Sequence, residues 1–204
     1  MSSPIDVSEL STNNPWEQRD HIGLANAIVA TVKIVLLKPK EFFDNLEIKE
    51  SIKDPFLFYL FLSIPISSLS LVLQHFFPMG VVLPQPLSIQ VVMIAFWIPA
   101  GIFVGAGILH LFVKMYGGTG GYKGTFNIMA YGTATALFVL IPYLGSFVAT
   151  VWGIVVTITG YQSIHKLSTG KALLAYFSLF IIVAVLVALA IALPVILAHK
   201  PLPE

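Results

Sequence analysis

AYGTATALFVLIPYLGSFVATVWG, residues 130–153, decides the fold, because it runs for 24 residues without one charged side chain. This is longer and more apolar than an ordinary core helix, and its length suits a crossing of the ~30 Å hydrocarbon core of a bilayer. Pro142-Tyr143-Leu144-Gly145 lies near its middle, and proline and glycine favour a turn over a continuous helix. The number of crossings therefore depends on whether the chain continues here or turns back.

The composition of the whole chain favours a membrane protein. Apolar residues make up 57% of the 204 residues and charged residues only 10%, against roughly 25% charged residues in soluble domains. Nine of the ten carboxylate side chains precede residue 55, and the tenth is Glu204. The chain has no cysteine, so disulfides, thiolate metal sites and cysteine nucleophiles are excluded. The first twenty residues are polar and acidic, so we expect no cleaved signal peptide.

Three other stretches have the ~20 apolar residues of a membrane-spanning helix, namely 56–77, 89–113 and 172–198. Residues 124–164 are too long for one span and suit two. We therefore interpret Pro142 to Gly145 as the turn of a hairpin, with Tyr143 at the headgroup level. The predicted fold is an all-α integral membrane protein with a five-helix transmembrane bundle over 55–199 and a short extracytoplasmic tail, 200–204. The alternative at the hairpin is one kinked, tilted span followed by an interfacial helix.

The lysines and the arginine set the predicted orientation. With the N-terminus in the cytoplasm, the five-span topology puts ten basic residues on the cytoplasmic side and only Lys200 on the other. This is the direction of the positive-inside rule. Without the hairpin, Lys166 and Lys171 would lie on the opposite side from Lys114 and Lys123, which would weaken the bias.

Residues 1–54 form a predicted cytoplasmic arm. Asp20 is suited to cap a helix over about 21–37, and Leu24, Val29 and Val32 belong to one apolar face with Lys33 opposite. This pattern predicts an amphipathic helix on the membrane surface. A second short helix follows around Phe42. The alternative is that both helices pack under the bundle without contacting lipid.

Motifs that suggest chemistry fail on spacing. In the loop YGGTGGYKGTF, residues 116–126, the order Lys-Gly-Thr replaces the Gly-Lys-Ser/Thr of a phosphate-binding loop. The loop at 168–172 has alanine after Gly170-Lys171 and no upstream glycine at the required spacing, so we interpret both loops as flexible cytoplasmic turns. His75, His110 and His165 lack the spacing of a metal site. We therefore predict no enzyme activity, no metal and no cofactor.

Small residues and prolines within the spans have packing interpretations. Gly101 and Gly105 form a small-residue face that favours close helix packing within the bundle, with homodimer contact as the alternative. Pro65, Pro99 and Pro194 are expected to kink their spans or to mark a hinge.

Three stretches resemble a known family. They are NPWEQRD with LLKPKEFFDNL after it, AYGTATALFVLIPYLG, and the run from Trp152 through GYQSIHKLSTGKA. In order and spacing they resemble the bacterial branch of the Yip family, the Ypt/Rab-interacting membrane proteins, over roughly residues 14–195. The matching signature residues are Tyr131, Pro142, Gly145, Trp152, His165 and Lys171.

The resemblance implies a cytosolic N-terminus and five spans. Eukaryotic members are associated with Rab-type GTPases and membrane shaping through an Asp-Leu-Tyr-Gly-Pro motif in the arm. That motif is absent here, so the resemblance does not extend to GTPase binding. It supplies no reaction for the bacterial relatives.

Our interpretation is a non-enzymatic membrane scaffold or trafficking-type adaptor of a bacterial inner membrane. Its expected partners are the lipid bilayer and either itself or another membrane protein, with no nucleic acid. The alternative is a small-solute or lipid transporter or channel, suggested by the prolines and by polar side chains at Asn127, Tyr131, Thr133 and Thr135.

Overall fold

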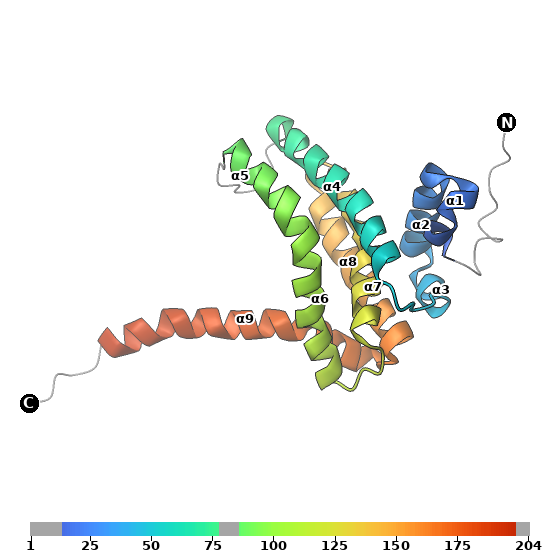
Figure 1. The fold of residues 1–204 in the computed structure, drawn as a ribbon. Coiled ribbons are helices and arrows are strands. Elements are labelled where there is room, and N and C mark those ends of the chain that lie inside the picture. Colours follow the sequence, from blue (N-terminus) through green and yellow to red (C-terminus); the bar gives the residue numbers. More distant parts are fainter. Residues whose placement is uncertain (1–13, 78–85, 199–204) are drawn as a thin grey trace, which may run out of the picture.

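The computed structural model describes residues 14–77 and 86–198, and this part of the chain is helical without a β-strand (Figure 1). The arm contains a 3₁₀ turn, η2 (Pro15–Gln18), and the short helices α1 (Arg19–Ile22), α2 (Leu24–Leu37) and α3 (Pro39–Asp44). The remaining elements are α4 (Lys53–Phe76), α5 (Leu87–Val92), the π-helix η3 (Met93–Trp97), α6 (Ile98–Met115), α7 (Tyr122–Gly132), the 3₁₀-helix η4 (Thr133–Leu140), α8 (Gly145–His165) and α9 (Thr169–Ala198).

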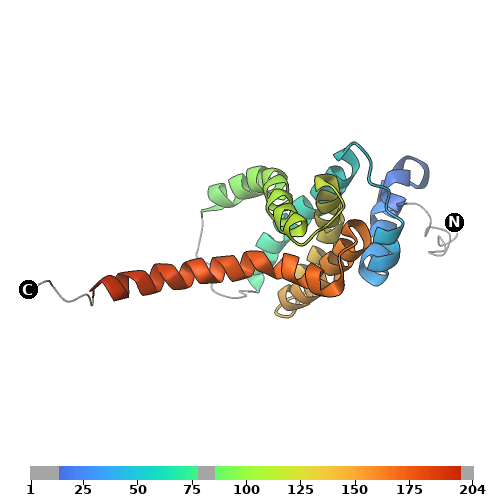
Figure 2. The same cartoon turned by 90° about the horizontal axis from the view of Figure 1, so that it is seen from below.

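Four helices are long and apolar enough to cross a membrane, namely Lys53–Gln74, Leu87–Met115, Gly145–His165 and Thr169–Ala192. The first three pack with α7 and η4 into a bundle. The α9 helix begins at one end of this bundle and then extends away from it, across the direction of α4 and α8 (Figures 1 and 2). Side chains from Phe180 to Ala192 are exposed along this outer part, as expected for a surface that faces lipid.

The stretch quoted first turns back on itself. The chain leaves η4 at Leu140, and α8 begins at Gly145. The Gly145 amide donates to the Ile141 carbonyl at 3.0 Å, and Tyr143 takes a left-handed φ of 65°. The α8 helix then packs against η4 and α7. A hairpin turn therefore stands where Pro142 and Gly145 predicted one, and the number of membrane crossings stays a prediction.

The element before this turn differs from the prediction. The sequence predicted a regular span, but α7 gives way to 3₁₀ geometry at Thr133, so this arm of the hairpin is not one of the four continuous apolar helices. Glycine at 132, threonines at 133 and 135 and the proline at 142 are all weak formers of a helix interior. These residues therefore weaken the α-helix at the point where it gives way to 3₁₀ geometry.

The prolines have different effects. Pro65 lies inside α4 without ending it, whereas Pro99 stands in the first turn of α6, directly after the π-helix. The Tyr59 hydroxyl of α4 donates to the Ile98 carbonyl at 3.0 Å and ties α4 to this irregular point. Pro194 lies within α9, whose helix continues to Ala198.

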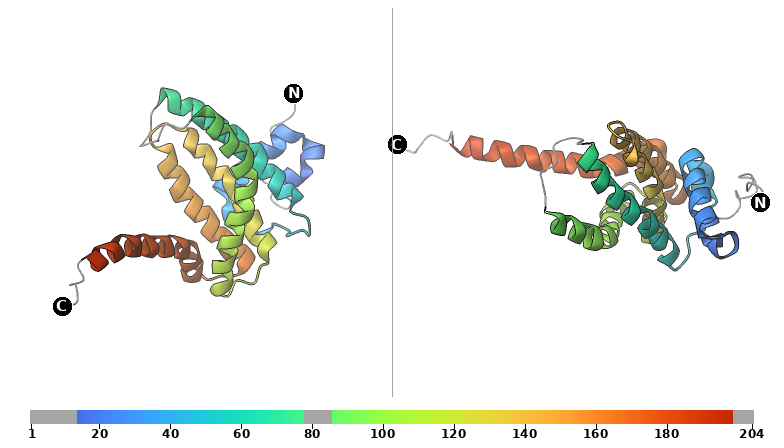
Figure 3. Two further views of the ribbon diagram at one scale, coloured as in Figure 1. Left: turned by 60° about the vertical axis from the view of Figure 1, so that its left-hand side comes forward. Right: turned by 90° about the horizontal axis from the view of Figure 1, so that it is seen from above.

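The arm packs along the side of the bundle (Figure 3). The predicted helix over 21–37 is broken at Gly23, whose φ of 83° ends α1 and starts α2. The buried face of α2 consists of Ala27, Thr31, Ile34 and Val35. Leu24 and Val29 of the predicted apolar face are exposed, and contact of this face with lipid stays a prediction. Nearly all of α2 is apolar, so periodicity alone does not choose its buried side.

The two glycines predicted to pack differ in their surroundings. A Cβ on Gly105 would lie 3.0 Å from the Met129 Cε of α7, whereas a Cβ on Gly101 would meet nothing within 4 Å. Close packing in the bundle is therefore seen at Gly105. Homodimer contact through this face stays a prediction.

Gly145→Ala tests the tight turn. A Cβ at this position would overlap the Phe138 carbonyl oxygen at the end of η4, so the backbone has to shift. We expect a loss of about 3 kcal/mol in the free energy of unfolding, measured by helix loss under denaturant in detergent micelles. Gly101→Ala is the matched control and should unfold as the wild type does. Equal stability of the two variants would show that η4 and α8 do not meet as described.

Candidate functional site

The aromatic ring of Trp16 is fully buried and fastens the arm to the start of α4. Its ring centroid lies 5.5 Å from that of Phe58 and 5.7 Å from that of Phe61. Its indole Nε1 donates to the Asp54 carbonyl at 2.7 Å. The Arg19 guanidinium lies 4.9 Å from the Trp16 ring and 2.8 Å from the Asp54 carboxylate. The NPWEQRD motif is thus a structural anchor, in which aromatic burial, a cation–π contact and an ion pair coincide.

Tyr131 joins three parts of the molecule. Its ring centroid lies 5.1 Å from both Phe42 of α3 and Phe58 of α4. Its hydroxyl accepts a hydrogen bond from the Asn14 amide at 2.6 Å. The side chain is fully buried. Its hydroxyl group, near the C-terminal end of α7, is therefore paired with Asn14, which directly precedes η2.

Trp152 and Asp44 attach the arm to α8. The Trp152 Nε1 donates to the Leu36 carbonyl at 2.9 Å, one of the carbonyls left unpaired where α2 ends. Hydrogen bonds from Lys40 and, to a smaller extent, from Ser163 of α8 lower the pKa of the Asp44 carboxyl. The arm is therefore held on α4, α7 and α8 together. We call these contacts of Asn14, Trp16, Arg19, Leu36 and Asp44 the arm junction.

A second polar cluster lies where α8 ends. His165 is fully buried, and its Nε2 lies 3.0 Å from the Thr125 hydroxyl. The same hydroxyl lies 2.9 Å from Nδ1 of His110. A threonine hydroxyl donates one hydrogen bond and accepts others, so Thr125 bridges the two imidazoles. Thr125, in the first turn of α7, therefore links His110 of α6 to His165 of α8.

The glycine-rich loop closes over His165. The Thr119 amide donates to the His165 carbonyl at 3.1 Å, and the Thr119 hydroxyl does so at 3.3 Å. A Cβ on Gly120 would lie 2.7 Å from the His165 Nδ1, and the Gly120 backbone lies beside this nitrogen without a well-formed hydrogen bond. The flexible turn expected at this loop is instead packed and hydrogen-bonded, because its glycines allow backbone to approach a buried ring.

The predicted signature residues form no single site. Tyr131 and Trp152 belong to the arm junction and His165 to the histidine cluster, whereas Pro142 and Gly145 shape the turn at the far end of α8. Gly145 and His165 are the first and last residues of that helix, about 30 Å apart. Lys171 is exposed, and its Nζ lies near Gly117 of the glycine-rich loop.

Sequence reasoning missed the partners of these residues. Asp54 and Thr125 were not singled out, and His110 was considered only as a metal ligand, although Asp54 is the last carboxylate before the apolar part of the chain. An isolated carboxylate at the start of a span is a signal for a cationic partner. The arm junction and the histidine cluster hold segments of the chain together. Within residues 14–77 and 86–198, no group of three possible metal ligands occurs.

Comparison with known proteins identifies one family. The family model of the Yip1 domain matches residues 33–192, which include the last five residues of α2 and every later described element up to Ala192 in α9. No curated protein and no solved structure matches the chain. Trp16 and Arg19 precede the matched range, so the anchor lies outside the family domain.

Substitutions at the arm junction should separate packing from hydrogen bonding. Trp16→Ala removes a fully buried ring and is expected to cost about 3–5 kcal/mol, which frees α2 and speeds its backbone hydrogen exchange. Tyr131→Phe removes only the contact with Asn14 and is expected to cost about 1 kcal/mol. The exposed His21→Ala is the control and should leave exchange unchanged. Unaltered exchange in Trp16→Ala would contradict the anchoring role.

Proposed function

The chain belongs to the Yip1-domain family and is an integral, multi-pass membrane protein, and on that premise we propose that it is a non-enzymatic membrane scaffold or adaptor. The apolar outer surface of the docked arm is the observation that supports this role. Leu24, Val29 and Leu37 of α2 are 45%, 51% and 76% exposed, although the helix is held at the arm junction. A fixed helix with outward apolar side chains offers a surface to lipid or to another membrane protein.

The depth of the arm supports contact with lipid. Trp152, which holds Leu36, lies about 10 Å along α8 from Gly145. Part of α2 therefore runs beside the middle of an apolar helix, where hydrocarbon would surround it. Lys33 projects from the exposed side, and its long side chain can extend its charge toward water while its methylene groups stay in lipid. A helix wedged beside the spans adds cross-section at one depth and so favours membrane curvature.

We propose five spans with the N-terminus in the cytoplasm of a bacterial cell. The fifth span would be α7 with η4, which together cover Tyr122 to Leu140 and reach about 30 Å when part of the length rises as a 3₁₀-helix. The basic residues and the hairpin support this topology. Partners would be the bilayer and a second copy or another membrane protein.

The contacts of the polar side chains argue against the transporter alternative. The amide of Asn127 donates to the Lys123 carbonyl at 2.7 Å, and the hydroxyls of Thr133 and Thr135 donate to backbone carbonyls within α7. Tyr131 pairs with Asn14. These side chains therefore satisfy one another and the helix backbone, and they do not line a path for a solute.

Single cysteines test the topology, because the chain contains none of its own. Tyr143 and Ser168 are exposed at opposite ends of α8. In intact cells a membrane-impermeant maleimide should label Tyr143→Cys, and should label Ser168→Cys only after the membrane is permeabilised. Labelling of both positions from one side would show that α8 does not cross, and the reversed pattern would overturn the orientation.

The triple variant Leu24→Gln, Val29→Gln and Leu37→Gln tests the scaffold role. Each change removes about 1.5–3 kcal/mol of apolar contact with lipid, while the exposed positions leave the folded bundle intact. Wild-type protein should convert large phospholipid vesicles into smaller, more curved ones in electron micrographs, and the triple variant should lose most of this activity. The exposed polar substitution Asn26→Ala is the matched control. Equal remodelling by the triple variant would contradict the proposal.

A further inference from the structure

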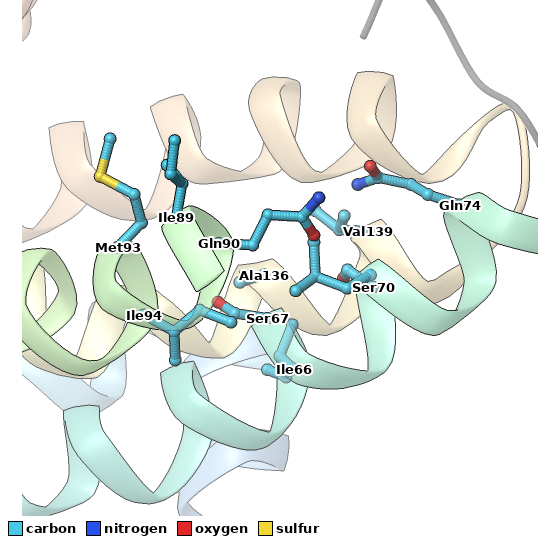
Figure 4. Close-up of a pocket in the computed structure, with 11 residues that line it drawn as sticks. Ile66, Ser67, Ser70, Gln74, Ile89, Gln90, Met93, Ile94, Ala136 and Val139 are labelled. Carbon is cyan, nitrogen blue, oxygen red and sulfur yellow. The ribbon is translucent and has the colours of Figure 1, made fainter. Parts of the chain in front are cut away.

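A cleft of about 620 Å³ opens between α4, the α5–η3 segment and η4 (Figure 4). This volume lies within the range of about 300–1,000 Å³ that is common for small-molecule sites. On α4 the lining residues run from Ile66 to Gln74. Ser70 lies about 24 Å along this helix from Asp54. The cleft is therefore far from the arm junction and belongs to the other half of the bundle.

Two of the three walls of the cleft depart from regular α-helix. Pro65 directly precedes the α4 wall, Met93 and Ile94 open the π-helix, and Ala136 and Val139 stand in the 3₁₀-helix. Isolated π-helical turns occur frequently at functional sites. Two irregular segments that line one space, with a proline next to the third wall, are harder to explain by packing alone than either segment by itself.

Four uncharged polar side chains line this space, namely Ser67, Ser70, Gln74 and Gln90. The Ser70 hydroxyl oxygen is buried and has no hydrogen-bond partner among the described residues. The Gln90 side chain reaches from α5 toward Ser70 (Figure 4). Hydroxyl and amide groups both donate and accept hydrogen bonds, and a buried hydroxyl without a partner is destabilising unless a ligand supplies one. The polar groups therefore suit a ligand that carries its own hydroxyl or ester oxygens.

The rest of the lining is apolar, and charge is absent from this region of the sequence. Ile66, Ile89, Met93 and Val139 contribute hydrocarbon surface. Between residues 55 and 113 there is no aspartate, glutamate, lysine or arginine. A phosphate or ammonium group here would lose its hydration without gaining an opposite charge, which is strongly unfavourable. A ligand of this cleft is therefore electrically neutral.

We infer that the cleft binds a neutral glycerolipid with a free hydroxyl group, of the diacylglycerol class. The glycerol hydroxyl and ester oxygens pair with Ser70 and Gln90, and one acyl chain lies along Ile89, Met93 and Val139. A bilayer surrounds the bundle and supplies such a ligand from the side. The inference rests on the membrane placement in the proposed function and adds a ligand to it.

Photo-crosslinking of the full chain in phosphatidylcholine nanodiscs tests this inference. The probe is a diacylglycerol with a diazirine on one acyl chain, and mass spectrometry locates the labelled residues. We expect labelling on α4, α5 and η3 that excess unlabelled diacylglycerol abolishes. Phosphatidylcholine and phosphatidylglycerol with the same chains should not compete. Equal competition by the phospholipids would show an ordinary lipid-facing groove and overturn the inference.

Variants of the cleft make the test specific. Ser70→Ala with Gln90→Leu keeps the volume nearly unchanged and removes the polar partners, so labelling should fall about tenfold, the loss expected for one or two hydrogen bonds. Ser68→Ala, on the exposed side of the same helix, is the matched control. A second variant, Ser70→Leu, fills the cleft and should also abolish labelling. Wild-type labelling in either cleft variant would contradict the inference.

The arm and cleft experiments can fail separately. The triple variant of α2 should bind the probe normally, since its substitutions lie at the arm. Loss of vesicle remodelling with intact labelling therefore supports both proposals. Absence of competed labelling in wild-type protein overturns the lipid site and leaves the cysteine and remodelling results valid.

Discussion

Burial of the Trp16 ring against α4 determines where the arm lies. The ring is held by Phe58 and Phe61, by the Asp54 carbonyl and by the Arg19 guanidinium. Asp54, Phe58 and Phe61 belong to the first long apolar helix, α4, and Arg19 is paired with the Asp54 carboxylate. The position of the arm therefore follows the position of α4 in the membrane. Without this contact, α2 would be a mostly apolar helix with no preferred side, free to lie on any lipid surface.

Side-chain hydrogen bonds to backbone carbonyls stabilise the irregular helices. Hydrocarbon provides no hydrogen-bond partners, so a break in a span has to be satisfied by the protein itself. Tyr59 donates to Ile98 beside the π-helix, Tyr122 donates to the Phe103 carbonyl and Trp152 donates to Leu36. Aromatic side chains with one polar atom supply these bonds while the rest of each ring stays in an apolar setting. Of these three donors, Trp152 is also one of the signature residues that resemble the family.

The sequence predicted the large elements and the turn, but not the contacts between them. Length and apolar content were enough to locate α4, α6, α8 and α9, and Pro142 with Gly145 was enough to place the hairpin turn. The change to 3₁₀ geometry at Thr133 was missed because hydropathy does not distinguish one helix type from another. The side of α2 that packs on the bundle was not predicted, because Leu24 and Val29 are as apolar as Ile34 and Val35. His165 was found by type, but its bridge through Thr125 to His110 joins three helices and has no spacing that a sequence would reveal.

The two ends of the bundle differ in chemistry, and this difference limits what each end can do. Around the arm junction, ion pairs such as Arg19–Asp54 and Lys123–Glu50 place charges at the margin of the apolar helices. Charged groups there can face water and the headgroups. The opposite half contains Ser67, Ser70 and the two glutamines with no charge nearby in the sequence, so any ligand must enter from lipid and carry its polarity as hydroxyl or ester groups. In the proposed scaffold, the arm would respond to the packing of the bilayer and the cleft would respond to neutral lipids.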